Sequence, residues 1–319
     1  MKLSIVTSLY RSAPYLPEFY RRAKTAALGL TRDYEIVLVD DGSPDDACAV
    51  AEALRAADDR VTVVQLSRNF GQHRAMMTGL AHATGDLVFL LDCDLEELPE
   101  WVTDFHADMQ ATGADVVYGV QERRKGGWWE RVSGGLFYRA LGGLASIPIP
   151  PNQVNCRLMT REYVAALVAH REREVFFAGL FATTGFRQVP RAVRKLSRGE
   201  SGYTFRKRLA MAVNSVTSFS TTPLRYIFYT GVLVLLVSVL ATGAAVANWL
   251  TGSVLAGWTS LIASVWFLGG LILFAQGVTA VYLGKVLSEV KQRPYTVIRR
   301  VLAGRAADTD RVGSERRAA

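Results

Sequence analysis

Charged side chains are missing from one long part of the sequence. Between Tyr226 and Gly284 there is no Asp, Glu, Lys, Arg or His. Such a run is too long for one membrane-spanning helix and suits two helices of roughly 20–25 residues with a tight turn. We therefore expect spans at about 226–248 and about 258–282, joined through Asn248–Gly257. The alternative is a buried helical hairpin of a soluble protein, but helices of that kind usually carry a polar face.

Cysteine is also scarce. Cys48, Cys93 and Cys156 have neither the spacing of a zinc site nor that of a disulfide framework, and are typical of cytosolic thiols. The N-terminus reads as a strand, residues 3–6, without an apolar signal segment, so no cleaved signal is expected. No nucleic-acid-binding module is recognisable, and nucleic acid is not an expected partner. The net charge of +8 suits an anionic membrane leaflet or phosphorylated substrates instead.

Basic residues flank the charge-free run on both sides, whereas its central turn has none. They are Arg206, Lys207, Arg208 and Arg225 before it, and Lys285, Lys291, Arg293, Arg299 and Arg300 after it. The positive-inside rule then predicts a multi-pass protein of the cell membrane with both termini in the cytoplasm. Residues 205–225 are expected to form an amphipathic juxtamembrane helix on the bilayer surface.

Strand and helix signals alternate over the first part of the chain. Strands are expected at 3–7, 35–39, 61–66, 87–91 and 116–118, and helices at 14–28, 72–83 and 99–111. This alternation predicts an α/β domain with a mostly parallel sheet and with ligands at the carboxyl ends of its strands. The expected organisation is a cytosolic domain (1–204), the amphipathic segment (205–225), two transmembrane helices (226–284) and a basic cytosolic segment (285–319).

Two acidic motifs follow predicted strands. Asp40-Asp41 ends one strand, and Asp92-Cys93-Asp94 ends another, with Glu96 two residues further on. Asp92, Asp94 and Glu96 occupy alternate positions and would point to one side of an extended segment. Carboxylates at this spacing suit a hard divalent cation, Mg²⁺ or Mn²⁺. The alternative is a pair of solvated loop aspartates, but two acidic motifs on one rim of a sheet favour a site.

Several motifs together carry a resemblance to a known family. They are Ile5–Tyr10 (IVTSLY), Val39–Ser43 (VDDGS), Ser67–Gly71 (SRNFG), Gly79-Leu80 with Gly85-Asp86, Asp92–Leu95 (DCDL), Arg198–Ser201 (RGES) and Ser218–Leu224 (SFSTTPL). The chain resembles family 2 glycosyltransferases, whose domain has the Rossmann-like GT-A fold. Within that family it resembles the polyisoprenyl-phosphate glycosyltransferases, the group of dolichyl-phosphate mannose synthase and bactoprenol glucosyltransferase. The resemblance covers about residues 1–300.

The resemblance implies an inverting transfer of a sugar from a nucleotide diphosphosugar, more plausibly a UDP- than a GDP-sugar, to a polyprenyl phosphate such as undecaprenyl phosphate. It also suggests a homo-oligomer, such as a tetramer. The nucleotide sugar, the lipid phosphate and the membrane are thus the expected partners. A phosphate acceptor is already an anion, so no general base is needed to create the nucleophile.

The resemblance also assigns roles to residues. Catalytic roles fall to Asp94, Asn155 and Arg198, and the metal ligands are Asp92, Asp94 and Glu96. The donor nucleotide is expected at Thr7, Leu9, Tyr10, Asp40, Asp41, Asp92 and Cys93. The acceptor phosphate needs cations, since guanidinium groups bind phosphate in a bidentate manner. The candidates are Arg123, Arg124, Arg131, Lys195 and Arg198.

The sequence departs from the family pattern at one notable place. Relatives commonly carry two aspartates in a D-x-x-D-F-R-L stretch, whereas this chain has Asn152 and Asn155 at those positions. A carboxylate role at Asn155 is therefore lost, although its amide could still orient donor hydroxyls. Two other functions remain open: a family 2 transferase that acts on a saccharide acceptor, and a non-catalytic membrane scaffold that keeps the fold.

Overall fold

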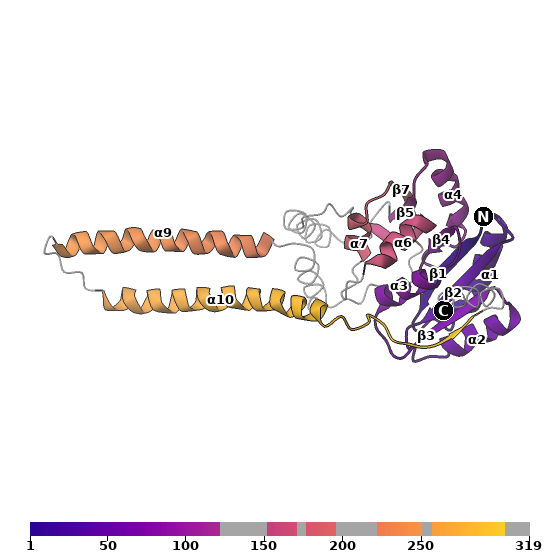
Figure 1. Cartoon of the computed structure of the whole chain (residues 1–319), viewed down its shortest axis with the longest axis horizontal. Helices are drawn as coiled ribbons and strands as arrows, with labels where there is room; N and C mark the ends of the chain where they lie inside the picture. Colours follow the sequence, from indigo (N-terminus) through magenta and orange to yellow (C-terminus); the bar gives the residue numbers. More distant parts are fainter. Residues whose placement is uncertain (122–151, 171–176, 196–221, 251–256, 304–319) are drawn as a thin grey trace, which may run out of the picture. The chain divides into compact units, whose positions relative to one another are not determined.

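The computed structural model describes residues 1–121, 152–170, 177–195, 222–250 and 257–303 (Figure 1). The chain divides into two compact units. The first comprises Met1–Val132, Ile149–Gly202 and Arg293–Ala319, and the second comprises Ser133–Pro148 and Tyr203–Gln292. The boundary expected near residue 204 stays a prediction, and the first unit also takes in Arg293–Ala319, which follow the second long apolar helix.

The first unit is built on an eight-stranded sheet with the order β7-β5-β6-β4-β1-β2-β3-β8. Its strands are β1 (Leu3–Leu9), β2 (Tyr34–Asp40), β3 (Val61–Leu66), β4 (Leu87–Leu90), β5 (Val116–Gln121), β6 (Gln153–Thr160), β7 (Gln188–Val193) and β8 (Ile298–Leu302). The run β4-β1-β2-β3 is parallel, β7 is parallel to β5, and β6 and β8 are antiparallel to their neighbours. The predicted mostly parallel sheet, with the GT-A architecture, is confirmed.

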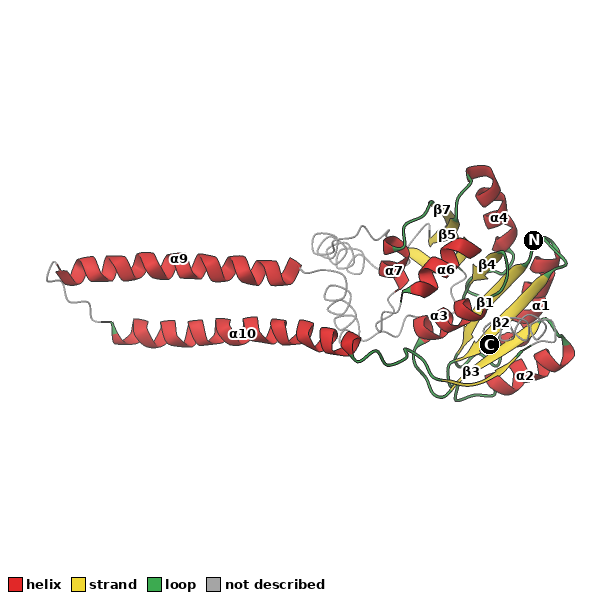
Figure 2. Cartoon of the chain, viewed as in Figure 1, coloured by secondary structure: helices red, strands yellow, loops and turns green. Residues whose placement is uncertain are grey.

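Helices cover both faces of this sheet (Figure 2). They are α1 (Leu16–Leu28), α2 (Ala47–Ala57), α3 (Gln72–His82), α4 (Trp101–Thr112), α6 (Arg161–Ala169) and α7 (Phe177–Thr183). Because successive strand residues face opposite sides, Ile5 packs in one buried cluster and its neighbour Val6 in the other. Helix α3 lies close against the sheet at Gly79, where a Cβ atom would come 2.5 Å from Val6 Cγ1. This close packing holds α3 against β1 and β2, since a Cβ atom at Gly79 would also come 2.9 Å from Val39 Cγ2.

The basic segment expected at 285–319 contains a strand that the sequence did not reveal. Strand β8 pairs antiparallel with β3, with Val64 opposite Val301. The pairing extends at one end, where the Ser67 amide donates to the Val297 carbonyl (2.9 Å). The side chain of Arg300 donates to Gln65 Oε1 (2.7 Å) and also pairs with Glu52. The chain thus returns to the sheet after the second unit and covers the exposed edge of β3.

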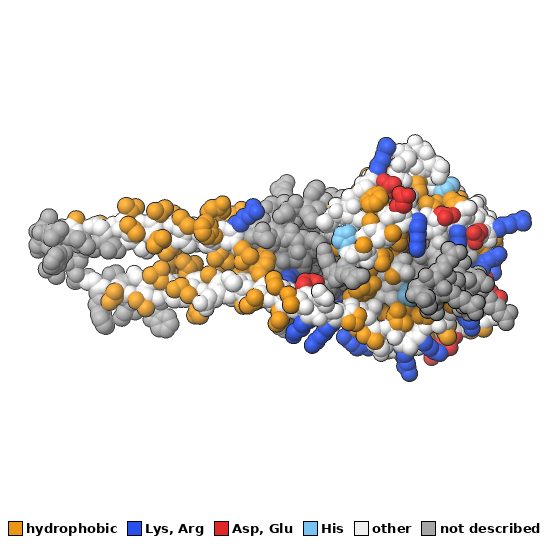
Figure 3. Space-filling model, viewed as in Figure 1, with side chains coloured by type: hydrophobic (Ala, Val, Ile, Leu, Met, Phe, Trp, Pro, Cys, Tyr) orange, Lys and Arg blue, Asp and Glu red, His pale blue; other side chains and the backbone are white. Residues whose placement is uncertain are grey.

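The second unit contains two long apolar helices, α9 (Thr222–Leu250) and α10 (Trp258–Val290). Both are long and apolar enough to cross a membrane, judged by length and composition. Their apolar side chains are exposed along the helices, as Leu240 (73%) and Leu273 (71%) illustrate (Figure 3). Each helix is longer than the predicted span: α9 includes 222–225, which were expected to belong to the amphipathic segment, and α10 continues past Lys285. The rest of that segment lies outside the described residues.

Candidate active site

The acidic segment after β4 is a turn. The Leu91 amide still bonds to the Val6 carbonyl (3.2 Å), and the regular strand ends there. Leu95 then adopts a left-handed conformation (φ 61°) and is buried, while Asp94 Oδ1 accepts a hydrogen bond from the Glu96 amide (2.9 Å). The prediction that Asp92, Asp94 and Glu96 would alternate along an extended segment is therefore wrong. Burial of Leu95 reverses the chain locally and gathers the carboxylates by a turn instead.

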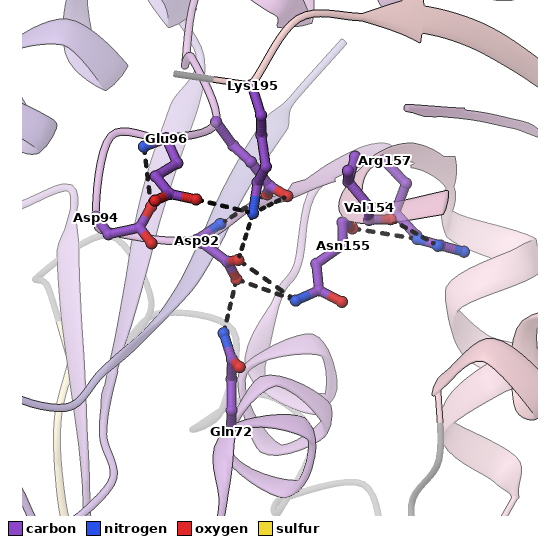
Figure 4. Close-up of polar contacts among 9 residues, drawn as sticks. Gln72, Asp92, Asp94, Glu96, Val154, Asn155, Arg157 and Lys195 are labelled. Atoms are coloured by element: carbon purple, nitrogen blue, oxygen red, sulfur yellow. Dashed lines mark hydrogen bonds and ion pairs between the residues drawn. The ribbon is translucent and has the colours of Figure 1, made fainter. Parts of the chain in front are cut away.

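Asp92 is held by side chains from two other elements (Figure 4). Gln72 Nε2, at the start of α3, donates to Asp92 Oδ1 (2.8 Å). Asn155 Nδ2, on β6, lies 3.2 Å and 3.4 Å from the two carboxylate oxygens. The fully buried Arg157 supports Asn155, since its Nε donates to the Asn155 carbonyl (3.2 Å) and its guanidinium stacks on the Phe181 ring. Asn155 is thus positioned to donate to Asp92, where an aspartate would place a second negative charge.

Lys195, two residues after β7, brings a cation into the same place (Figure 4). Its Nζ lies 3.8 Å from Asp92 Oδ2, 3.5 Å from Glu96 Oε2 and 3.5 Å from Glu97 Oε1. Glu97 is completely buried, and its Oε2 accepts from the Asp92 amide (3.1 Å). Its Oε1 has no hydrogen-bond partner among the residues that the structure describes and lies 3.5 Å from the ammonium group of Lys195. We call these residues, with Asp94, the carboxylate–lysine cluster.

Burial dominates the electrostatics of this cluster. It raises the pKa of Asp92 to about 6, in spite of the opposing charge of Lys195. It also raises the pKa of Glu97 to about 8, and the negative charge of Asp92 adds to that shift. For Lys195, burial lowers the pKa but the surrounding carboxylates, Glu97 first, raise it by more, so the net direction is upward. The ammonium group therefore stays charged and is the counter-ion of the cluster.

The donor chemistry of the cluster fits a hard divalent cation. Asp92, Asp94 and Glu96 offer only oxygen ligands, the kind that Mg²⁺ and Mn²⁺ prefer. Within the described residues, no three His, Cys, Asp or Glu side chains stand together around a position for a metal ion. The carboxylates of Asp92, Glu96 and Glu97 converge instead on the ammonium group of Lys195.

The second acidic motif lies at the end of β2 and is held by the main chain. Asp41 accepts hydrogen bonds from the amides of Phe70 (2.7 Å) and Gly71 (2.9 Å). Asp40 accepts from the Ser43 amide (3.0 Å). Burial raises the pKa of both carboxyl groups. Gly42 allows the loops to meet, since its φ is 59° and a Cβ there would lie 2.5 Å from the Arg68 carbonyl carbon.

The loop that Asp41 holds leads directly into Gln72, which reaches Asp92. The two acidic motifs are therefore connected through one short segment, as expected for motifs on one rim of a sheet. Sequence reasoning missed both Gln72 and Glu97. The position of Gln72, directly after the Ser67–Gly71 motif, could have suggested it, whereas nothing in the sequence pairs Glu97 with Lys195.

The other predicted site residues divide into two groups. On β1, Thr7 and Leu9 are buried, and Tyr10 after it is 46% exposed; Cys93 is buried within the turn, where burial raises the pKa of its thiol. Of the five predicted phosphate-binding cations, the structure brings Lys195 to the cluster. The remaining four lie outside the described residues: Arg123, Arg124, Arg131 and Arg198.

Comparison with known proteins gives consistent results. The profile of "Glycosyl transferase family 2" matches residues 4–167. A Mycobacterium tuberculosis protein described no further than as a glycosyltransferase is 51% identical over 302 residues, 94% of this chain and 88% of that protein. The prophage-derived bactoprenol glucosyl transferase of Shigella flexneri is 33% identical over 94% of this chain and 98% of its own length. An undecaprenyl-phosphate 4-deoxy-4-formamido-L-arabinose transferase of an Enterobacter species is 31% identical over 97% and 96%.

Proposed function

Because this chain belongs to family 2 of the glycosyltransferases, we propose that it transfers a sugar from a nucleotide diphosphosugar, a UDP-sugar, to a polyprenyl phosphate at the cytosolic face of the cell membrane. Two observations support the lipid acceptor. Relatives that match nearly the whole chain are named for bactoprenol and for undecaprenyl phosphate. Helices α9 and α10 are apolar enough to hold the enzyme in the membrane that contains such a lipid.

The observation that carries the reaction class is the carboxylate–lysine cluster at the carboxyl end of β4. Ligands of open α/β sheets bind at this edge, and the cluster combines hard oxygen ligands with a cation. Asp40 and Asp41, at the end of β2, would face the base and ribose of the donor. Asp92, Asp94 and Glu96 would hold Mg²⁺ or Mn²⁺, which when bound neutralises charge on the leaving diphosphate.

The chemistry of the acceptor explains why a base is not required. A phosphate oxygen of the lipid attacks the anomeric carbon, a new C–O bond forms, and the bond from that carbon to the diphosphate oxygen breaks. The bonding pair leaves with the nucleoside diphosphate, and the anomeric configuration inverts. No proton moves. Asn155, which has no basic group, is compatible with this reaction because its amide positions Asp92 by hydrogen bonds.

Cations must hold the acceptor phosphate near a second, equally negative diphosphate. Lys195 and the arginines Arg123, Arg124, Arg131 and Arg198 are the proposed contacts. Arg198 and Asp94 are proposed as catalytic residues, because a cation near the leaving group and a carboxylate that orients a divalent ion both stabilise the transition state more than the ground state.

The test is nucleotide release by the full chain purified in detergent. A panel of UDP- and GDP-sugars is offered with Mn²⁺ or Mg²⁺, with and without undecaprenyl phosphate, and the lipid product is identified by mass spectrometry. We expect release that requires the lipid, and a loss of about 10²–10³-fold in Asp94→Asn. The control is Asp59→Asn, at an exposed carboxylate outside the cluster. Lipid-independent transfer to a saccharide would replace the proposed acceptor, and an inactive protein that binds no donor would support a scaffold.

A further inference from the structure

The carboxylate–lysine cluster holds far more negative than positive charge. Four carboxyl groups follow one another in the turn from Asp92 to Glu97, and Lys195 provides the ammonium group that three of them share. Amide donors of Gln72 and Asn155 hold Asp92 but add no net charge. Lys195 itself comes from the end of β7, about a hundred residues further along the chain.

We propose that Lys195 is a tethered substitute for the divalent cation: its ammonium holds the carboxylates together while no metal is bound, and it leaves them when the metal enters. The inference deepens the proposed function, because it rests on the assignment of the metal to Asp92, Asp94 and Glu96. A divalent ion held by Asp92, Asp94 and Glu96 would share two carboxylates, Asp92 and Glu96, with the ammonium of Lys195, and two cations so close repel each other. Binding of one therefore weakens binding of the other.

The geometry supports an exchangeable contact over a permanent one. The three N–O distances of Lys195, 3.5–3.8 Å, are longer than those of charge-assisted hydrogen bonds, about 2.7–2.9 Å. The side chain is 22% exposed, and its flexible four-carbon stem can carry the ammonium out of the cluster. The buried Glu97 Oε1, which has no hydrogen-bond partner among the described residues, lies 3.5 Å from the ammonium, so a cation at this place has a carboxylate oxygen to face. The released ammonium is then available to a phosphate group of the donor or acceptor.

The direct test is the affinity for Mn²⁺ without any donor or lipid, measured from the electron paramagnetic resonance signal of free Mn²⁺. We expect Lys195→Met to bind Mn²⁺ on the order of tenfold more tightly than the parent chain, since a competing charge is gone and the stem is kept. Lys195→Arg, which keeps the charge, should not bind more tightly. The matched control is Lys24→Met, at a lysine that pairs with Asp58 outside the cluster (2.7 Å) and should leave the affinity unchanged.

A second measurement uses the parent protein and so does not depend on the folding of a variant. An amine-reactive ester is applied with and without Mn²⁺, and modification is quantified by peptide mass spectrometry. Lys195 should become more reactive when Mn²⁺ is present, while Lys24 should not change. Equal or lower reactivity of Lys195 with Mn²⁺ would contradict the exchange.

The outcomes also separate this inference from the proposed function. If Lys195→Met binds Mn²⁺ with the same affinity as the parent chain or more weakly, the proposed competition is wrong. The proposal of a metal-dependent transferase would not be affected by that result. Absence of Mn²⁺ binding in every variant would overturn both the inference and the metal requirement. Lipid-dependent transfer, measured separately, decides whether the acceptor has been identified correctly.

Discussion

The two acidic motifs lie at the ends of β2 and β4, on either side of β1, and they are held by different means. Asp41 receives hydrogen bonds from two main-chain amides of the loop at Phe70 and Gly71. Asp92 receives them from the side chains of Gln72 and Asn155 and faces the ammonium of Lys195. Main-chain donors cannot turn away without loss of the loop conformation, whereas side chains can rotate. The motif after β2 is thus held as part of the scaffold, whereas side chains hold the motif after β4, as the proposed exchange requires.

Substitution of the scaffold aspartate should have the largest effect on stability. Asp41→Ala leaves two main-chain amides without their acceptor and should lower the free energy of unfolding by about 3 kcal/mol. Chemical denaturation of the parent and variant measures this loss, and Asp59→Ala serves as an exposed control. Mn²⁺ should not restore the stability of Asp41→Ala. If Mn²⁺ fully restored the stability of this variant, both acidic motifs would belong to one metal-dependent unit, and the contrast between them would be wrong.

Substitution of the neutral donor beside Asp92 should have a smaller, metal-sensitive effect. Asn155→Asp replaces an N–H donor with a second carboxylate at 3.2 Å from Asp92. Without metal, the free energy of unfolding should fall by about 2 kcal/mol, because a hydrogen bond is exchanged for like-charge repulsion. Mn²⁺ should recover the loss, as a thermal melt with and without the ion would reveal. Asn155→Ala, which adds no charge, should gain less from Mn²⁺ than Asn155→Asp.

The third prediction concerns pH. The pKa of Glu97 rises from 4.5 to about 8 on folding, so the folded state binds this proton more tightly than the unfolded state. Its contribution to stability is complete below about 4.5 and is lost as the pH rises through about 8. The melting temperature of the metal-free chain should therefore fall across this range. Glu97→Gln should flatten the profile, and an equally steep profile in that variant would assign the pH dependence to another group.

The sequence predicted the elements that are made of local, apolar runs. The strand expected at 61–66 is β3 as observed, and the helix expected at 72–83 differs from α3 by one residue. Burial on both faces makes such strands nearly continuous apolar runs, which is a strong local signal. Strand β8 has two arginines among its five residues and lies at an edge, so its composition gives no comparable signal.

For the candidate site, the sequence predicted where in the fold the two acidic motifs stand but not how their side chains are arranged. The positions of Asp41 and Asp92 followed from the rule that ligands bind at the carboxyl ends of parallel strands. The turn after Asp92 depends on burial of Leu95, and the position of Lys195 depends on how β7 joins the sheet beside β5. Both depend on contacts between segments that are distant in sequence, and the local pattern of side chains does not encode such contacts.

Strand β8 has a consequence for how the protein is made. Its Arg300 and the Gln65 that it contacts are 235 residues apart in sequence. At the usual rates of synthesis, roughly 10–50 s separate the appearance of these two residues on the ribosome. During that time both apolar helices are synthesised, while β3 waits as an open sheet edge, the kind that readily pairs with another chain. The nascent chain must therefore pass through a stage in which its two long apolar helices have been made but its sheet is incomplete.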